Sequence, residues 1–581
     1  MSFRAAVLPA LAELALLSLA LVALAVLAAP LGDPVVMLGR GARYAATAPG
    51  TLVSGKFASL PAQAFAQHIG ALLSLLALSA WLVLVLGRLA LPAGAILMFA
   101  CAIWSALLAW LFLQPPGPTW PLAQPQLGQL ASVLAGWPWW ALPAAAMAAV
   151  PLASRLTRHS WQAVRRPSRV WLFPMWVLLT GLGLLWLTDY SARAAVLHRH
   201  LAQQQFQALA LAWAVLTTLA GMVPSVLNFR ARALARADGA APTDKPHMGI
   251  AASRFDRATR LCRAVWPRIG LLVVLALWAA MVLLVVGLHP AQSALRAEAI
   301  RLPLVIGGGW LAYRWIDDSQ GLRWSFARGM LAASALIGVA LLPLAGTGDN
   351  GQVLLLTLAA AALLGGITGG LVRKSVPAAG LGLLVFAALV AAVMWTLFTH
   401  GAAHSRTVAF RLEALAKPWA SHYEYLSELH WFMANTPAGG HGLGHVPWCG
   451  TLASLVDGAC TAIPRQTQSD YVLAALVGVW GDLAALAIAA ATAVWLLGLM
   501  PSAQASSVHG LAPRADRLGA WIVTFFACIS LVQLFVTCLG SLGLMPLTGV
   551  GFPLLAYGKA SLLVTACIAA FGINRPAHPQ P

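Results

Sequence analysis

The sequence has 581 residues, of which 60% are hydrophobic and only 9% are charged. Soluble globular proteins carry about 25% charged residues, so this composition excludes a soluble globular fold and indicates an integral membrane protein. Lys and Arg total 36 against 17 Asp and Glu, which gives a formal net charge of +19. The basic residues are dispersed between apolar runs rather than gathered in one patch, which indicates cytoplasmic loops and argues against nucleic-acid binding.

A helix that crosses a membrane needs about 20 mostly apolar residues, and about fourteen runs of the sequence reach that length. The first four lie near residues 8–30, 68–89, 92–114 and 130–152. Ten more follow, near residues 170–188, 205–226, 268–288, 297–315, 329–346, 352–370, 376–398, 471–499, 518–545 and 552–574. We therefore expect an all-α polytopic membrane protein of about 14 transmembrane helices. The first run is long and has only Arg4 before it, which indicates a retained helix rather than a signal peptide.

Clusters of basic residues in the loops predict the orientation of the chain, because cytoplasmic loops are enriched in Lys and Arg. The clusters lie within residues 155–169, 230–263, 323–328, 373–374 and 514–517. With the N-terminus inside, all of them fall on the cytoplasmic side. The same register places the C-terminus in the cytoplasm and residues 399–470 outside.

This long outer loop, residues 399–470, is close to charge balance and lacks the hydrophobic period of a helix. Its charged residues are Glu413, Glu424, Glu428, Asp457, Asp470, Arg406, Arg411, Lys417 and Arg465. Cys449 and Cys460 either close a small disulfide loop in an oxidising exterior or remain free thiols. Aromatic residues between Trp419 and Trp448 predict an amphipathic part that lies at the membrane interface. The histidines of the loop lack the spacing of a zinc site.

Near the C-terminus, residues 543–563 read GLMPLTGVGFPLLAYGKASLL, with prolines and glycines between two apolar runs. Irregular backbone at membrane depth occurs where protein covers it or where it lines a cavity, although a tight helical hairpin would also explain this segment. The segment resembles GLLPxTGxPLPFxSYGGSS, the signature of the SEDS family (shape, elongation, division and sporulation), which includes RodA-like and FtsW-like proteins. The matching residues are Gly543, Leu544, Pro546, Thr548, Gly549, Pro553, Tyr557, Gly558 and Ser561.

Further motifs of the family follow in the family's order. Asp349 and Gly351 match a QPDLGT-like motif of the family, and Glu298 and Arg301 match the Glu and the Lys of its PSExxK motif. Residues 442–444 match the GLG of the large outer loop, and Asp470 matches the Asp of the HTDF motif. Tyr190-Ser191 and the glutamines 203–205 also resemble the first family span and its exit loop. The resemblance covers residues 170–575. It divides the chain into an extra membrane region of about four helices, residues 1–165, and a SEDS-like ten-helix core, residues 166–581.

The resemblance implies an inverting glycosyltransferase of the bacterial cytoplasmic membrane. Such enzymes polymerise glycan strands from lipid II, an undecaprenyl-pyrophosphate disaccharide-pentapeptide, in cell-wall synthesis, cell shape or division, together with a class B penicillin-binding protein. Asp470 would be the catalytic base, and a divalent cation, Mg or Mn, could assist the leaving pyrophosphate. The candidate substrate-binding residues are Glu298, Arg301, Asp349, Arg465, Gln468 and Lys559.

Most of these residues have a structural alternative. Asp470 and Asp349 could cap the helices that follow them, Arg301 could pair with Glu298, and Lys559 could extend toward lipid headgroups.

The sequence also departs from the family pattern. Gln468 stands at the usual His, Gly478 and Val479 at a Glu pair, Lys559 and Gly551 at a Gly and a Pro of the signature, and Thr537 at an Asn. A non-catalytic scaffold or regulator of a cell-wall complex, or a transporter of a lipid-linked substrate, are therefore the alternative functions.

Overall fold

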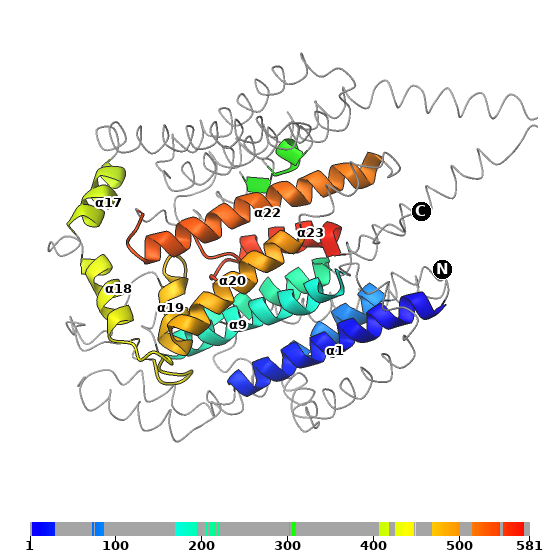
Figure 1. Ribbon diagram of the computed structural model, residues 1–581, viewed down its shortest axis with the longest axis horizontal. Helices are drawn as coiled ribbons and strands as arrows, with labels where there is room; N and C mark the ends of the chain where they lie inside the picture. Colours follow the sequence, from blue (N-terminus) through cyan, green and yellow to red (C-terminus); the bar gives the residue numbers. More distant parts are fainter. Residues whose placement is uncertain are drawn as a thin grey trace, which may run out of the picture.

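The computed structural model describes residues 3–28, 73–74, 76–85, 169–193, 201–202, 204–206, 208–216, 219, 301–302, 305–309, 406–417, 424–446, 448, 467–499, 514–545 and 550–573. Within these residues the regular structure is entirely helical, as predicted (Figure 1). The helices are α1 (Phe3–Ala28), the short 3-10 turn η2 (Arg169–Trp171), α9 (Leu172–Arg193), α17 (Arg406–Ala416), α18 (Glu424–Ala434), α19 (Val472–Trp480), α20 (Asp482–Leu499), α22 (Arg514–Ser541) and α23 (Lys559–Ile573).

Four helices in the described part of the chain are long and apolar enough to cross a membrane. These segments are Ala10–Leu27, Leu172–Ser191, Asp482–Leu499 and Gly519–Ser541. Helical residues within 73–85, 201–219 and 301–309 also coincide with predicted spans. The predicted spans near 92–114, 130–152, 268–288, 329–346, 352–370 and 376–398 lie outside the described residues, so the full number of spans and the division at residue 165 stay predictions.

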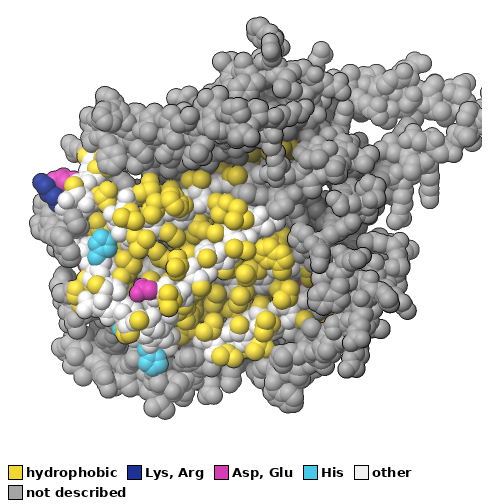
Figure 2. Space-filling model, viewed as in Figure 1, with side chains coloured by type: hydrophobic (Ala, Val, Ile, Leu, Met, Phe, Trp, Pro, Cys, Tyr) yellow, Lys and Arg dark blue, Asp and Glu magenta, His cyan; other side chains and the backbone are white. Residues whose placement is uncertain are grey.

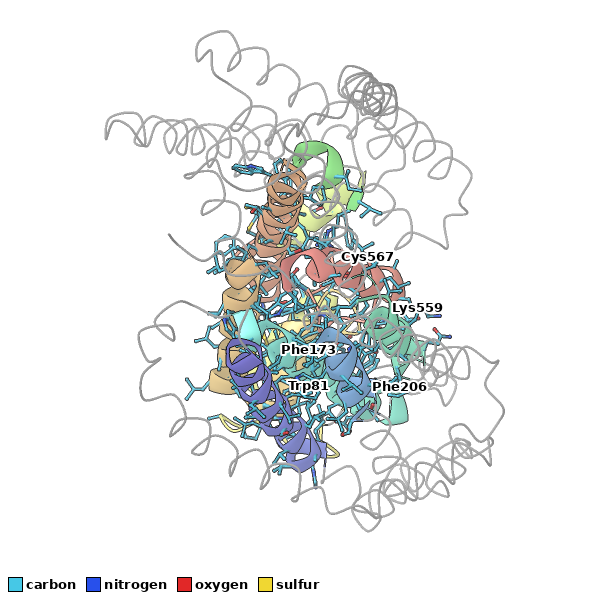
Figure 3. The ribbon with its side chains drawn as sticks, turned by 90° about the vertical axis from the view of Figure 1, so that its right-hand side faces the viewer. Trp81, Phe173, Phe206, Lys559 and Cys567 are labelled. Carbon is cyan, nitrogen blue, oxygen red and sulfur yellow. The ribbon has the colours of Figure 1, made fainter. Side chains whose placement is uncertain are left out.

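Helix α9 lies in the middle of the described helices, and 89% of its apolar segment is buried (Figure 1). Phe173, at its beginning, lies among the neighbouring helices (Figure 3). Helix α1 packs along α9, and a Cβ atom added to Gly181 would lie 2.9 Å from Cδ2 of Leu24. A glycine on α9 thus allows the N-terminal helix to approach closely.

Helices α20 and α22 expose large apolar side chains, as expected of a surface that faces lipid. Leu483 is 82% exposed, Leu486 66% and Phe535 62%. Figure 2 shows hydrophobic side chains across the middle of this face, whereas histidines lie toward its left-hand end. The arrangement agrees with a membrane protein whose polar residues gather at one end of the described helices, which we call the α18 end.

The predicted single span over residues 471–499 is wrong. It consists of two helices separated at Gly481, whose φ of 85° is in the left-handed region that favours glycine. Only α20 has the length of a span, because its 18 residues extend over about 27 Å. Helix α19 instead lies at a steep angle to α20 across the α18 end (Figure 1), and its residues 472–479 are all buried.

The long loop 399–470 contains two short helices. Helix α17 and helix α18 both lie in it, each 11 residues long. On α18, Leu426, Leu429 and Phe432 are buried while Trp431 is partly exposed. These positions repeat at helical spacing, so α18 packs one face on the bundle and leaves aromatic surface on the other.

Gly543, the first glycine of the signature segment, ends helix α22. Gly543 has a φ of 71°, its N–H donates to Gly540, and the N–H of Leu544 donates to the carbonyl of Leu539 at 2.9 Å. This is the Schellman arrangement, in which a left-handed glycine satisfies the last carbonyls of a helix. The His430 ring of α18 packs on this glycine, because an added Cβ would lie 2.7 Å from its Cε1 atom.

Burial lowers the pKa of His430 below its ordinary 6.5. Because the folded pKa is the lower one, the neutral ring stabilises the fold above pH 6.5, and this contribution is lost as the pH falls through 6.5 toward the folded pKa. We expect the melting temperature in detergent to fall over this range, and to fall less in His430→Gln. An equal fall in both proteins would contradict this assignment.

Candidate functional site

The irregular segment 550–558 connects the α22 side of the bundle to α23, and α22 holds its beginning. The Gln533 amide donates to the carbonyl of Gly551 at 2.6 Å, and the Thr537 hydroxyl lies 3.2 Å from the carbonyl of Val550. Leu554 has a φ of 67°, which is unusual for a side chain of this size. The surrounding contacts therefore hold a strained backbone, a feature that is common at functional sites.

Helix α9 lies against the middle of the same segment. A Cβ atom on Gly183 would lie 3.0 Å from Cα of Leu555, so the glycine favours this close approach. The indole N–H of Trp186 donates to the carbonyl of Leu555 at 3.1 Å. Backbone groups that would be costly to bury without partners are thereby satisfied.

Two glutamines of segment 201–219 hold the end of segment 550–558. The amide of Gln205 donates to the carbonyl of Ala556 at 3.2 Å and accepts from the N–H of Gly558 at 3.1 Å. The hydroxyl of Tyr557 donates to Oε1 of Gln204 at 2.6 Å.

Gln205→Leu removes both of these side-chain contacts while keeping a side chain of similar size. We expect a loss of about 2 to 3 kcal/mol of stability, because the Ala556 carbonyl and the Gly558 N–H lose their partner together. The melting temperature in detergent measures the effect. Gln204→Leu is the matched control and should cost about 1 kcal/mol, since it removes one bond to a partly exposed hydroxyl. Equal losses in the two variants would contradict the paired contact of Gln205.

The turn 467–470, which carries Asp470, lies on segment 550–558. The N–H of Tyr557 donates to the carbonyl of Gln468 at 2.9 Å. A Cβ atom on Gly551 would lie 3.6 Å from the carbonyl oxygen of Ser469. The Asp470 side chain is partly exposed at the end of this turn. Two sequence motifs that are far apart in the chain thus meet at the α18 end.

Asp470 does not cap the helix that follows it, so the capping alternative is wrong. Helix α19 begins at Val472, Tyr471 occupies the capping position, and its side chain makes no capping hydrogen bond. The Asp470 carboxylate therefore lies one residue before the capping position of α19.

The carboxyl end of α9 also contacts the turn 467–470. The hydroxyl of Tyr190 donates to Oε1 of Gln468 at 3.2 Å. The preceding residue, Asp189, is fully buried and accepts from the Gly444 N–H at 3.1 Å and from the Trp448 indole N–H at 3.2 Å. Asp189 is not among the predicted site residues, although a carboxylate in the last turn of an apolar run is itself a signal of function.

The GLG segment holds the far end of α19. The N–H groups of His441 and Gly442 donate to the carbonyls of Gly478 and Val479 at 2.8 and 2.9 Å. A Cβ atom on Gly478 would lie 2.6 Å from Cζ of Phe432, so no larger residue fits there without movement. At this position the SEDS pattern has a glutamate, and the packing of α18 explains why this chain has a glycine.

Two candidate cations are described, and they occupy different surroundings. Lys559 begins α23, is exposed and lies at the edge of the described helices (Figure 3). Arg301 is buried; its guanidinium donates to the Ser530 hydroxyl and lies 5.0 Å from the Phe526 ring centre. Ser530 is at the middle of the apolar segment of α22, so Arg301 is held within the span. The exposure of Lys559 agrees with either phosphate binding or headgroup contact.

Other predicted site residues lie outside the described residues: Glu298, Asp349, Arg465, Cys449 and Cys460. The disulfide and the Glu298–Arg301 pair therefore stay predictions. Among the described side chains, no three of His, Cys, Asp and Glu gather into a group that could hold a metal ion. The divalent cation therefore stays a prediction.

No protein-family model matches the chain, and no curated protein matches it. Among solved structures, one described as "Structural coordination of polymerization and crosslinking by a peptidoglycan synthase complex" is similar, with 19% sequence identity and a TM-score of 0.41. The match covers 69% of this chain and 96% of that chain.

Proposed function

We propose that the chain is a SEDS-type membrane glycosyltransferase that polymerises undecaprenyl-pyrophosphate-linked sugars such as lipid II at the outer face of the bacterial cytoplasmic membrane. The basic clusters in the predicted loops support an outer position for the α18 end. Its process would be cell-wall synthesis in growth or division, with a class B penicillin-binding protein as partner. The partner follows from the sequence resemblance alone.

One observation carries this proposal. The turn that bears Asp470 is hydrogen-bonded to Tyr557 of the signature segment through Gln468. The sequence resemblance implies that the Asp470 turn and the signature segment both belong to the reaction centre. Nothing in the local sequence requires these two segments to be in contact. Their contact at the polar end of an apolar bundle supports a single site formed by both motifs.

The chemistry assigned to Asp470 is general base catalysis. A sugar hydroxyl of the acceptor loses its proton to the Asp470 carboxylate while its oxygen attacks the anomeric carbon of the donor. The bond from that carbon to the lipid pyrophosphate breaks, and the pyrophosphate leaves with the electron pair. A correctly placed base contributes about 10²- to 10⁴-fold to such a step.

The leaving pyrophosphate requires positive charge nearby. We assign Lys559 to this role because it is exposed two residues after Tyr557, which contacts the Asp470 turn. Gln468 would offer its amide N–H groups to the substrate, because its oxygen already accepts from Tyr190. Arg301 has protein partners at mid-span, so we expect it to contribute mainly to the position of α22. A divalent cation near the leaving group stays a prediction.

A non-catalytic scaffold is the second candidate, and it rests on the departures from the family at Gln468 and Gly478. A transporter of the lipid-linked substrate is the third.

One reconstitution separates these functions. The purified protein is mixed with fluorescent lipid II and Mg²⁺, with and without a co-encoded penicillin-binding protein, and the products are resolved on a glycan gel. Polymer that a muramidase digests supports the enzyme. Absence of polymer under both conditions refutes it in favour of the scaffold, or of the transporter if labelled lipid II crosses protein-containing liposomes.

A further inference from the structure

Two consecutive residues at the end of α9 hold the two ends of α19. Tyr190 contacts Gln468 in the turn before α19. Asp189 accepts a hydrogen bond from the N–H of Gly444. In the same segment, the N–H groups of His441 and Gly442 donate to the last carbonyls of α19. Helix α19, which follows directly on Asp470, is thus fixed relative to α9 at both of its ends.

The chemistry of Asp189 is unusual for a purely packing residue. Its side chain has no exposed surface, and it lies within the candidate membrane segment Leu172–Ser191. A carboxylate in such a place is costly unless it is well hydrogen-bonded, and each of its oxygens accepts from a neutral N–H group. The two oxygens of one buried side chain thus hold the backbone at Gly444 and the ring of Trp448 against the end of α9.

Aromatic contacts connect this carboxylate to the rest of the site. The Trp448 ring, which donates to Asp189, lies edge-on to Tyr190 with centroids 5.2 Å apart. It also stacks on Phe432 of α18, with centroids 5.9 Å apart. Movement of the loop would therefore disturb the ring that contacts Tyr190 and the helix that covers Gly478.

We propose that Asp189 is a positioning residue that sets the orientation of α19, and through it the direction of the Asp470 carboxylate. It does not touch the reacting atoms. The consequence for catalysis rests on the proposed function, whereas the grip on α19 is a property of the fold that can be measured separately.

The test compares Asp189→Asn with Thr188→Val. The asparagine keeps the shape but cannot accept from both N–H groups, since one of its two terminal atoms is itself a donor. Thr188 is the adjacent buried residue, and its hydroxyl donates at 2.7 Å to the carbonyl of Leu184 in its own helix. Its replacement should therefore leave the loop and α19 in place.

Hydrogen exchange in short peptides of residues 436–448 is the first readout. We expect Asp189→Asn to speed exchange of Gly444 and also of His441 and Gly442, whose donors grip α19, with no change in α20. Faster exchange at Gly444 alone would overturn the proposal, because the grip on α19 would then be independent of Asp189. A uniform increase in exchange that includes α20 would also overturn the proposal, because it would indicate general destabilisation of the protein.

Polymer formation is the second readout. We expect Asp189→Asn to lower kcat by about 10- to 100-fold with little change in KM, as for a catalytic group displaced from its productive position. A rise in KM at constant kcat would overturn the positioning role. If the wild type forms no polymer, the proposed function fails, and the exchange of His441 and Gly442 alone decides whether Asp189 positions α19.

Discussion

Asp470→Asn is expected to lower kcat for glycan polymerisation by about 10²- to 10⁴-fold, with a small change in KM. The amide has the shape of the carboxylate but does not accept a proton at neutral pH, so only the base is lost. Asp470 lies outside α19 and is partly exposed, so we expect the substitution to change the melting temperature little. Initial rates over a range of lipid II concentrations separate kcat from KM.

Asp482→Asn is the matched control for this experiment. Asp482 is an exposed carboxylate at the other end of α19, where it begins α20. Both variants remove a negative charge from this region. Only Asp470 lies in the turn that contacts segment 550–558, so only its replacement changes the proposed site. Equal rates for Asp470→Asn and the wild type, or equal losses in the two variants, would contradict the role of Asp470.

Gly481→Ala is expected to destabilise the protein by at least about 3 kcal/mol, from strain and a backbone clash together. Its φ of 85° disfavours any side chain, and an added Cβ would overlap the Ala438 carbonyl oxygen and lie 2.8 Å from its carbon. Neither neighbour is a flexible side chain that could rotate away. The melting temperature and the monodispersity of the protein in detergent measure the loss.

Gly439→Ala is the matched control, which tests whether the loss of stability in Gly481→Ala comes from the clash at Gly481 itself. A Cβ atom on Gly439 would meet nothing within 4 Å, although the residue is next to the same clash. We expect its melting temperature to stay within about 1 to 2 °C of the wild type, since an exposed substitution without a clash changes stability little. A comparable loss in Gly439→Ala and Gly481→Ala would show that tight packing at Gly481 is not the cause.

The membrane helices were predictable because their signal is local. Apolar runs of the required length identify α1, α9 and α22 within a few residues of their ends. The break at Gly481 was not predictable, because the run LAALVGVWGDLAALAIAA is continuously apolar except at Asp482. A glycine within such a run is usually tolerated in a helix, and here the packing of residues 438–442 decides the turn.

The site was predictable where polar or irregular sequence interrupts an apolar run. This signal identifies Asp470 and residues 543–563, and the structure brings the Asp470 turn and segment 550–558 together. The roles of Gln205 and Gln533 had no such signal, because an amide that binds a distant carbonyl follows no sequence period. Arg301 shows the reverse: its charge was recognised, but its burial against Phe526 and Ser530 depends on tertiary packing.

The most direct test of the central claim is to locate the bound substrate in the wild-type protein. Lipid II that carries a photoreactive group on its sugar is reconstituted with the protein in liposomes, crosslinked, and mapped by mass spectrometry. We predict that crosslinks concentrate in residues 467–470 and 550–558, and that excess unlabelled lipid II competes them away. Competed crosslinks that avoid both segments would contradict a site formed by the Asp470 turn and the signature segment.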